Sequence, residues 1–518
     1  MNIGNLLTRH ARYQPDKLAL VFEDRRLTYR EYNRNVNRLA NALLEMGVKK
    51  GDKISTLLPN CMEILEVYWA AAKIGAVAVP HSMLLLADGL KSLLNDSDTT
   101  TVVTCSAMVE TLNRIRKDLP AISEDRFLLI DGADTPGYRD YHALTAAAGD
   151  TDPQGIEIHE DDIYNIMYSS GTTGDPKGIV ISHKIRVAYS TLSASIFRMT
   201  PESVMLHSGA LVFNGAFITL LTSMFLGSTF ILHGQFDTEA FIDTVRREKV
   251  THVMMVPSQV VGVLHSSNFS AEALSTLEMI CSVGAPLHRE HKEELIRHLP
   301  NRLYELYGLT EGFMTILDRN DYEQKTGSVG APTPFFDLRI EDDRKNPVPA
   351  GQVGEIVGKG PIQMVEYYKR PEMTRRAIVN GWLYTGDMGY VDEDGFLYLV
   401  DRKKDMIISG GVNVYPKDIE EIIVQHPDVM EAAVFGVLDE KWGETPVAAV
   451  TLSKGATLTA EELVQWTNER VSAKFQRIRR AILLKDFPRN AAGKTMKRII
   501  RDDFLERNII NRSHKDET

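Results

Sequence analysis

Residues 168–178 read YSSGTTGDPKG and lie between two apolar runs, IYNIM before and IVIS after, that have the composition of β-strands. The stretch holds three glycines, four serines or threonines and one lysine. A loop of this kind can turn successive backbone N–H groups inward to bind an anion, and a lysine adds charge to the site. The pattern therefore predicts a strand–loop–strand unit that binds phosphate.

The loop has two other interpretations. Its spacing is not GxxxxGKS/T, so a Walker-type NTPase is not supported. A flexible surface hairpin stays open as the alternative, because loops rich in Gly, Ser and Thr are common in that role. If the loop binds phosphate, the expected side-chain donors are Ser169, Ser170, Thr172, Thr173 and Lys177.

Helix and strand signals alternate in the N-terminal part of the chain. Thr28 and Glu31 form a capping box before an apolar repeat of helical spacing, and Gly47 follows as a stop signal. A short strand over residues 53–58 and a helix over residues 62–74 come next. This alternation continues through much of the first 300 residues or so and favours layers of helices on largely parallel sheets.

Residues 203–236 contain no Asp, Glu, Lys or Arg. The length would suffice to cross a bilayer. However, His207, Asn214 and several small polar residues interrupt the run. A buried helix followed by a buried strand over residues 228–232 fits this pattern better than a membrane span.

The pattern changes after about residue 325. Short alternating runs with many glycines predict a β-rich subdomain over about 325–402, with a turn at residues 392–395. From residue 403 the signals are those of a small α+β domain. Within it we expect helices over 416–425 and 459–473 and a strand over 432–437. The expected fold class is α/β, with a large N-terminal domain over 1–402 and a small C-terminal domain over 403–518.

Composition narrows the classes of function. The chain has 518 residues and a net charge of −11, which argues against nucleic-acid binding as the main role. The three cysteines form no CxxC pair, so a zinc centre or a disulfide framework is not expected, and a reducing cytoplasm fits best. The N-terminus lacks the pattern of a secretory signal, and an organellar presequence is the less favoured alternative. A homodimer is compatible with the sequence.

Several separated motifs together give a family resemblance. In chain order they are YSSGTTGDPKG, SVGAPL at 282–287, YGLTE at 307–311, YTGD at 384–387, DRKKDMIISGG at 401–411 and PRNAAGK at 488–494. Over nearly the whole chain the sequence resembles the adenylate-forming superfamily, which includes acyl-CoA synthetases, peptide-synthetase adenylation domains and beetle luciferases. The resemblance implies the two-domain fold of that superfamily, with a mobile C-terminal domain.

The resemblance also implies roles for individual residues. It makes Lys494 the catalytic lysine, has Thr310 contact the α-phosphate of ATP, and gives Glu311 the role of Mg²⁺ ligand. Gly171 and Gly174 join the loop donors around the β- and γ-phosphates. Adenine would pack against Tyr307, Gly308 and the segment Gly284, Ala285 and Pro286, and the ribose would contact Asp387 and Arg402. Singly, each residue has a simpler structural explanation; the ordered set makes the functional one preferable.

These roles agree with the chemistry of adenylation. A carboxylate attacks the α-phosphate, so two anions must be brought together and cations must offset their repulsion. Lys494 and a Mg²⁺ ion on Glu311 can do this, since Mg²⁺ needs only one or two carboxylates besides substrate oxygens. The implied reaction joins a carboxylic acid to coenzyme A through an acyl-adenylate, with ATP as co-substrate.

The second half of that reaction calls for a domain movement. The resemblance places Lys404 at a hinge about which the C-terminal domain swings. The swing removes Lys494 and brings Gly410 and Gly411 to a narrow pantetheine tunnel, where a side chain would block close approach. Trp442 matches a position that packs on CoA in some relatives, although a core or surface aromatic is an equally good explanation.

The acid is expected to be a hydrophobic monocarboxylate: fatty, aromatic or alicyclic. The candidate pocket residues carry no charge, and they are Phe213, Asn214, Gly215, Met255, Val283, Phe313 and Met314. Two positions depart from the family pattern. Phe213 or Asn214 stands where relatives carry a histidine that gates the acid pocket, and the nearby His207 is a candidate to take its place. Phe475–Gln476 stands where an aromatic–Lys pair is common. The alternatives left open are a stand-alone acyl-AMP ligase that loads a carrier protein and an inactive homologue that acts as a binding protein.

Overall fold

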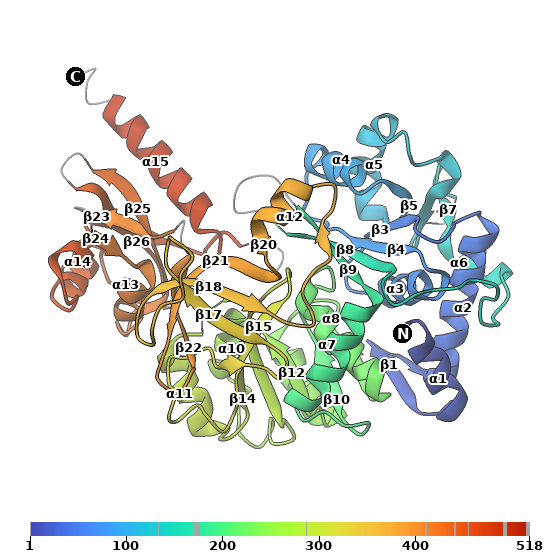
Figure 1. Ribbon diagram of the computed structural model, residues 1–518, viewed down its shortest axis with the longest axis horizontal. Helices are drawn as coiled ribbons and strands as arrows, with labels where there is room; N and C mark the ends of the chain where they lie inside the picture. Colours follow the sequence, from blue (N-terminus) through green and yellow to red (C-terminus); the bar gives the residue numbers. More distant parts are fainter. Residues whose placement is uncertain are drawn as a thin grey trace.

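The computed structural model describes residues 2–132, 134–169, 177–285, 287–402, 405–409, 412–439, 442–453, 455–489 and 495–513. The strands in these ranges form four sheets. Figure 1 shows two large layers and a β-rich layer in one body, and a smaller lobe at the C-terminal end from which the last helix projects. The expected fold class, α/β with a large N-terminal and a small C-terminal domain, is confirmed.

The first layer is a sheet of eight strands in the order β19-β9-β8-β4-β3-β5-β6-β7. Its strands are β3 (Lys53–Leu57), β4 (Val77–Pro80), β5 (Thr99–Thr104), β6 (Phe127–Leu129), β7 (Arg139–Asp140), β8 (Ile163–Ser169), β9 (Lys177–Ser182) and β19 (Glu366–Tyr367). Those from β8 to β7 run parallel, and β9 and β19 are antiparallel additions at one edge. The predicted strands on either side of the glycine-rich loop are therefore confirmed as the hairpin β8–β9.

The second layer is a sheet of nine strands in the order β16-β15-β14-β13-β12-β10-β11-β1-β2. Its strands are β1 (Leu18–Phe22), β2 (Arg25–Thr28), β10 (Val204–His207), β11 (Thr229–Leu232), β12 (His252–Met255), β13 (Met279–Val283), β14 (Leu303–Leu309), β15 (Phe313–Leu317) and β16 (Ala331–Pro332). The middle of this sheet is parallel, as expected from alternating helix and strand signals.

Helices cover both large sheets and fill the space between them. They are α1 (Asn5–Tyr13), α2 (Tyr29–Glu45), α3 (Met62–Ile74), α4 (Ala87–Asp96), α5 (Ser106–Ile115), α6 (Tyr141–Ala147), α7 (His183–Ile196), α8 (Asn214–Leu226), α9 (Thr238–Glu248), α10 (Pro257–Leu264) and α11 (Arg289–His298). Every residue of α3 is buried, and α8 packs along α7 (Figure 1). The predicted capping box of Thr28 and Glu31 starts α2.

The uncharged stretch 203–236 folds as β10, α8 and β11, so the predicted buried helix and following strand are confirmed. Within the described ranges, no helix combines the length and the apolar character that a bilayer span would need. The charge-free sequence is explained instead by position, because the middle of α8 is buried between the two large sheets. Figure 1 shows α7 and α8 in that middle layer.

The third sheet consists of β17 (Asp337–Glu341), β18 (Gly354–Lys359), β20 (Ile378–Val379), β21 (Trp382–Val391) and β22 (Leu397–Arg402), and α12 (Pro371–Ala377) precedes β20. This confirms the predicted β-rich region. The predicted turn at residues 392–395 joins β21 to β22, where the N–H of Asp392 bonds to the carbonyl of Phe396 at 3.0 Å.

The C-terminal lobe is built on β23 (Ile407–Ser409), β24 (Val412–Val414), β25 (Val429–Asp439), β26 (Gly443–Leu452) and β27 (Arg480–Leu484), with α13 (Pro416–Ile423), α14 (Ala460–Asn468) and α15 (Lys497–Ser513). The predicted helix over 459–473 is too long. Thr459 is its N-cap, and the helix stops at Asn468, whose side chain bonds to both the N–H and the carbonyl of Ile478.

Candidate active site

The central motif, residues 307–311, forms the end of β14 and the turn into β15. The two strands are antiparallel, with Gly308 opposite Met314. Gly312 closes the turn with φ of +110°, and a Cβ there would lie 2.2 Å from the carbonyl oxygen of Ile362, so no other residue fits without displacement of the backbone. The N–H of Met364 donates to the carbonyl of Glu311 at 2.9 Å. The backbone of Glu311 is thus fixed on both sides.

The Glu311 carboxylate is held by Tyr367, which is the last residue of the edge strand β19. The Tyr367 hydroxyl donates to Oε1 of Glu311 at 2.8 Å. The ammonium of Lys177 lies 5.0 Å from the centre of the same tyrosine ring. Burial, and then the charge of Glu311, raise the pKa of Tyr367, so it stays a donor at neutral pH. One tyrosine therefore joins the end of the glycine-rich loop to the predicted Mg²⁺ ligand.

A second tyrosine–carboxylate pair lies between β14 and the β-rich sheet. The Tyr307 hydroxyl donates to Oδ2 of Asp387 at 2.8 Å, and both side chains are buried. Asp387 lies opposite Arg402 in the register of β21 and β22. The structure therefore brings together the backbone positions of three residues that the sequence assigned to adenine and ribose, although the side chain of Arg402 is not described.

Several predicted site residues lie outside the described residues. They are Ser170, Gly171, Thr172, Thr173, Gly174, Pro286, Lys404, Gly410, Gly411 and Lys494, and the side chain of Ser169 is likewise not described. Of their described neighbours, Lys177 begins β9, and Gly284, with φ of +90°, and Ala285 follow the end of β13. Thr310 is half-buried in the β14–β15 turn.

Of the seven pocket candidates, Val283 and Met314 pack in the core between the two large sheets, and Phe313 lies on the other face of β15, against Phe336. Phe213, Asn214 and Gly215 form the half-buried start of α8, Val283 ends β13, and Phe313 and Met314 begin β15. Phe313 also stacks edge-on against Tyr307, at 6.5 Å between ring centres, and its ring fills the space that a side chain at Gly358 would need.

The prediction of Met255 as a pocket residue is wrong. Its side chain belongs to the cluster on the other face of the nine-stranded sheet, where it lines a small internal gap with Phe241 and Val260. Adjacent residues of a strand point to opposite faces, and it is Met254 that packs in the core between the sheets. The sequence placed the strand correctly but chose the wrong one of two neighbouring methionines.

His207, the substitute considered for a gating histidine, is a core residue. Its ring stacks on Phe230 at 6.1 Å, and Nδ1 lies 3.2 Å from the hydroxyl of Thr219. Burial lowers the pKa of His207 to about 4, so the ring is neutral at physiological pH.

Arg186 was not among the predicted site residues; it lies on α7 with no exposed surface. Its Nε donates to Asn165 at 3.2 Å, and its Nη1 donates to Oδ1 of Asn214 at 2.8 Å. The Asn214 amide in turn donates to the hydroxyl of Tyr189 at 3.1 Å. Nη2 is buried and has no hydrogen-bond partner among the described residues. Arg186 therefore fixes the orientation of Asn214, one of the predicted pocket residues.

The charge of Arg186 is unusual for a protein core. The guanidinium stacks on Phe217 at 4.3 Å from the ring centre, but in the described part of the chain no carboxylate forms an ion pair with it. Burial lowers its pKa to about 10, which still leaves it charged at neutral pH. The signal was present in the sequence, because Arg186 shares the spacing of Tyr189, Ser190 and Ser193 on the buried face of α7.

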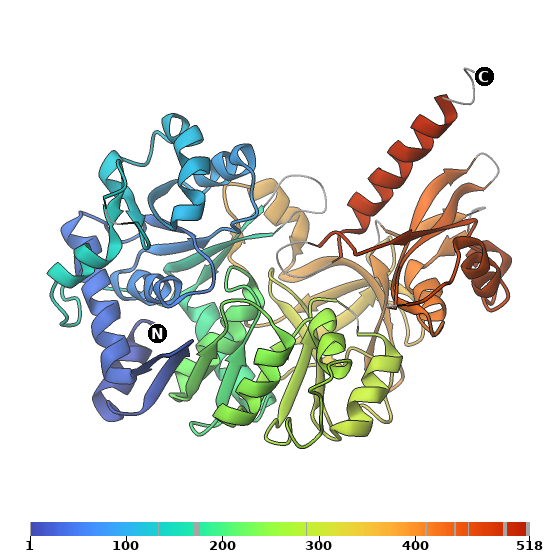
Figure 2. The ribbon, with the colours of Figure 1, turned by 180° about the vertical axis from the view of Figure 1, so that it is seen from behind.

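The C-terminal lobe rests on the nine-stranded sheet and on the β-rich sheet through α13. The half-buried Lys417 donates to the carbonyl of Leu399 in β22 at 3.0 Å, and Glu421 lies 3.4 Å from Nδ1 of His288. Figure 2 shows the C-terminal lobe beside the rest of the molecule from behind, with α15 pointing away from the body. Trp442 lies at the other end of the lobe, after β25, with 42% of its surface exposed.

The family comparisons cover both parts of the chain. The AMP-binding enzyme family matches residues 7–368, and the AMP-binding enzyme C-terminal domain matches residues 418–494. Similar curated proteins include a feruloyl-CoA synthase from Streptomyces sp (33% identity; 97% of this chain and 99% of that one) and the long-chain-fatty-acid–CoA ligase FadD13 from Mycobacterium tuberculosis (35%; 97% and 98%). An indoleacetate–CoA ligase from Aromatoleum aromaticum is 32% identical over 97% and 98%.

Solved structures of CoA ligases are also similar to this chain. ATP-bound MatB from Rhodopseudomonas palustris has a TM-score of 0.88 and 29% identity and covers 97% of this chain and 99% of its own. The o-succinylbenzoate CoA synthetase from Bacillus subtilis, in complex with its acyl-adenylate, has a TM-score of 0.84 and 30% identity over 95% and 97%. Together with the ordered motifs and the Glu311–Tyr367–Lys177 arrangement, these matches show that the chain belongs to the AMP-binding enzyme family, within the adenylate-forming superfamily of acyl-CoA synthetases.

Proposed function

We propose that this protein is an ATP- and Mg²⁺-dependent ligase that converts a carboxylic acid to its acyl-CoA through an acyl-adenylate. The observation that carries the proposal is the linkage of Lys177, Tyr367 and Glu311, because it joins the phosphate-binding loop to the acidic residue of the central motif. Over nearly their whole length, the similar proteins are named as CoA ligases of fatty or aromatic acids.

In the first step, one oxygen of the substrate carboxylate attacks the α-phosphorus, the bond to the bridging oxygen breaks, and pyrophosphate leaves. We assign Thr310 and Lys494 to the α-phosphate and the loop residues to the β- and γ-phosphates, where they offset the charge that the two anions bring together. The described part of the loop ends in Lys177, whose ammonium faces the ring of Tyr367.

Glu311 suits the role of Mg²⁺ ligand. Tyr367 occupies only Oε1, and among the residues that the structure describes Oε2 has no hydrogen-bond partner, so it can coordinate a hard cation. Mg²⁺ bound there supplies positive charge next to the triphosphate. The hydrogen bond from Tyr367 keeps the carboxylate oriented before the metal arrives.

For the nucleoside, we propose that adenine lies against Tyr307 and the turn after β13. Tyr307 is pinned at its hydroxyl by Asp387, which leaves the ring face as the surface for a base. Asp387 and Arg402, opposite each other on β21 and β22, are then at hand for the ribose hydroxyls.

The acid is proposed to be a hydrophobic monocarboxylate. Val283 and Met314 pack in the core between the sheets, Phe213 and Gly215 form the half-buried start of α8, and none of the four carries a charge. Asn214 adds only an amide, which is hydrogen-bonded to Arg186 and Tyr189. An amino acid is not favoured, because none of the proposed pocket residues can pair with its ammonium group. The similar proteins that act on ferulate, indoleacetate or long fatty acids, as their names state, fit this class.

For thioester formation, we propose that the C-terminal domain, from residue 403 on, turns about Lys404. Lys494 then leaves the site, and Gly410 and Gly411 line the path of the pantetheine. Trp442 is exposed enough to pack on CoA. The CoA sulfur attacks the acyl carbon, and AMP leaves with the oxygen that had bridged the acyl group and phosphorus. The three buried, unpaired cysteines agree with a cytoplasmic location.

The test is pyrophosphate release from ATP and Mg²⁺ with a panel of carboxylic acids, each with and without CoA, and with Glu311→Gln as the background variant. We expect fast release that needs CoA and one hydrophobic acid, and a large loss in Glu311→Gln. A single stoichiometric burst that CoA does not relieve would contradict the proposal and point to another acceptor, such as a carrier protein. Turnover with an amino acid would contradict the substrate class.

A further inference from the structure

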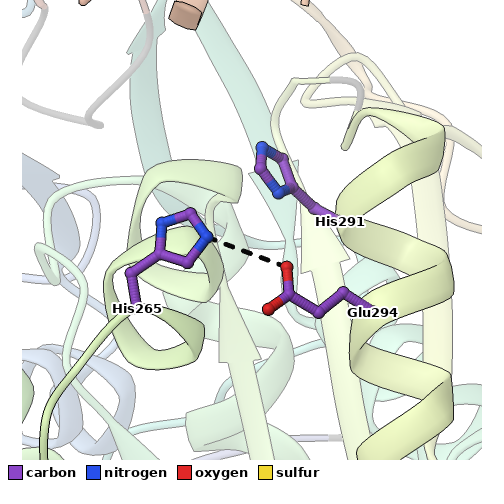
Figure 3. A group of neighbouring side chains, drawn as sticks. All are labelled: His265, His291 and Glu294. Atoms are coloured by element: carbon purple, nitrogen blue, oxygen red, sulfur yellow. Dashed lines mark ion pairs between the residues drawn. The ribbon is translucent and has the colours of Figure 1, made fainter. Parts of the chain in front are cut away.

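Two histidines and a glutamate converge at α10 and α11, and none of the three is among the residues assigned to the adenylation site. His265 follows the last turn of α10, and His291 and Glu294 lie one helical turn apart on α11. Their donor atoms all lie within 4.8 Å of one another, and Nε2 of His265 is 3.7 Å from Oε2 of Glu294. Figure 3 shows the three side chains pointing toward a common point.

This cluster borders a cavity of about 250 Å³. One wall comes from α10 and α11, and the other comes from the C-terminal lobe. The residues of that second wall follow α13 or lie in β25 and after β26, and they are Val424, His426, Pro427, Val429, Met430 and Ser453. The space exceeds that of a water molecule several times over, so an ion and its remaining waters can be accommodated.

The donors are free for a ligand. Nδ1 of His291 is buried and makes no hydrogen bond to any described residue, which is costly unless something binds there. Glu294 has only the half-exposed His265 as ion-pair partner in the described ranges. A tetrahedral metal with bonds of about 2.0 Å holds its ligand atoms about 3.3 Å apart, so small side-chain rotations bring the three donors into place.

His426 is not a fourth ligand in this arrangement. Its Nδ1 accepts the N–H of Asp428 at 3.1 Å, so in the neutral ring the proton is on Nε2, and the ring packs on Trp466. The remaining coordination position faces the cavity and falls to water. Two imidazoles and one carboxylate with an open position is a donor set for divalent first-row transition metals, whereas Mg²⁺ prefers oxygen ligands only.

We propose that His265, His291 and Glu294 form a second metal site, which binds a divalent transition metal ion of the Zn²⁺ class and is distinct from the Mg²⁺ site at Glu311. The ion cross-links the end of α10 to α11 and lies under the C-terminal lobe. Because it binds only the folded arrangement of the three donors, it also stabilises that arrangement.

The test uses the full-length protein, from which bound metal is first removed by a chelator. The protein is then dialysed against Zn²⁺ in the presence of millimolar Mg²⁺, and its metal content is measured by elemental analysis. We expect one Zn²⁺ per chain at low micromolar free Zn²⁺ and a higher melting temperature with the ion. His291→Ala and His265→Ala should each weaken binding by about 10-fold or more and abolish the rise in melting temperature.

The matched control is His298→Ala, which removes a histidine from the same helix that packs on Phe269 and not on the cluster. His265 is half exposed, so its replacement leaves the fold intact even if His291→Ala does not fold. Equal Zn²⁺ content in wild type, His265→Ala and His298→Ala would overturn the proposal. So would displacement of the ion by millimolar Mg²⁺. Neither result depends on ligase activity.

Discussion

Arg186 is the residue whose position most calls for a functional explanation. An unpaired buried charge lowers the free energy of unfolding by several kcal/mol, and replacing buried charged groups with apolar ones is often neutral or stabilising. In Arg186→Met we therefore expect an unfolding free energy within about 2 kcal/mol of wild type, with the loss of two asparagine partners included. Because Asn214 loses its anchor, KM for the acid should rise about 5-fold or more, while KM for ATP should stay within about 2-fold.

Unfolding and steady-state kinetics measure both effects. Lys184→Met is the matched control, since Lys184 is an exposed cation on the same helix. An unchanged KM for the acid in Arg186→Met, or an equal change in the control, would show that Arg186 has no part in acid binding.

Tyr367 is predicted to act through Glu311. Tyr367→Phe keeps the ring beside Lys177 but removes the 2.8 Å hydrogen bond to the carboxylate. Loss of such a supporting contact typically weakens a metal site about 10-fold or more, so the Mg²⁺ concentration for half-maximal activity should rise. Tyr368→Phe removes a similar bond, to Asp98 at 2.8 Å, and leaves the bond from Tyr367 to Glu311 in place. If both variants show the same Mg²⁺ dependence, the role of Tyr367 is wrong.

At the scale of single elements, α3 contains an acid that links stability to pH. Glu66 on this buried helix accepts from the hydroxyl of Tyr141 at 2.6 Å and from Asn35 on α2 at 3.2 Å. Burial is the main cause that raises its pKa from 4.5 to about 7, with a smaller contribution from Glu63. Between these values the folded state holds a proton that the unfolded state has lost, so stability falls as pH rises from about 4.5 to 7.

We expect this loss to be on the order of 1 to 3 kcal/mol. Denaturant unfolding at several pH values measures it. Glu66→Gln replaces the carboxyl with a neutral amide that does not titrate. Its free energy of unfolding should therefore lack this part of the pH dependence. A wild type and a Glu66→Gln protein with parallel pH profiles would contradict the assignment.

The elements also show where sequence reasoning succeeds and where it stops. The capping box of Thr28 and Glu31 predicts the start of a helix from local side-chain chemistry. The composition around residues 168–178 likewise predicts the two strands that flank the loop, so both features were predictable. Which face of a strand meets the pocket depends on packing between distant elements. Met254 and Met255 are therefore equivalent in the sequence and opposite in the structure. The bond from Arg186 to Asn214 joins two helices, and no local pattern gives it.

At the scale of the whole molecule, the proposed cycle needs the C-terminal domain in two orientations. In the structure, α13 contacts the N-terminal part through Lys417 and through the pair of Glu421 and His288. These polar contacts would have to break, and interfaces between domains of one chain commonly permit such movement.

Separate assays of the two half-reactions test the domain movement. Lys494→Ala should slow adenylate formation by about 10²-fold or more while thioester formation from added acyl-AMP stays near the wild-type rate. Lys404→Pro should show the reverse bias, because proline fixes φ at the proposed hinge. If either variant lost the same factor in both half-reactions, the proposal that the C-terminal domain serves one active site in two orientations would be contradicted.

The most direct test of the central claim follows the oxygen atoms. The acid is supplied with both carboxylate oxygens as ¹⁸O, together with ATP, Mg²⁺ and CoA, and the products are analysed by mass spectrometry. Attack of the carboxylate on the α-phosphorus, followed by cleavage of the acyl–oxygen bond by CoA, predicts AMP with one ¹⁸O and unlabelled pyrophosphate. Unlabelled AMP, or label in inorganic phosphate formed together with ADP, would contradict an acyl-adenylate and with it the proposed function.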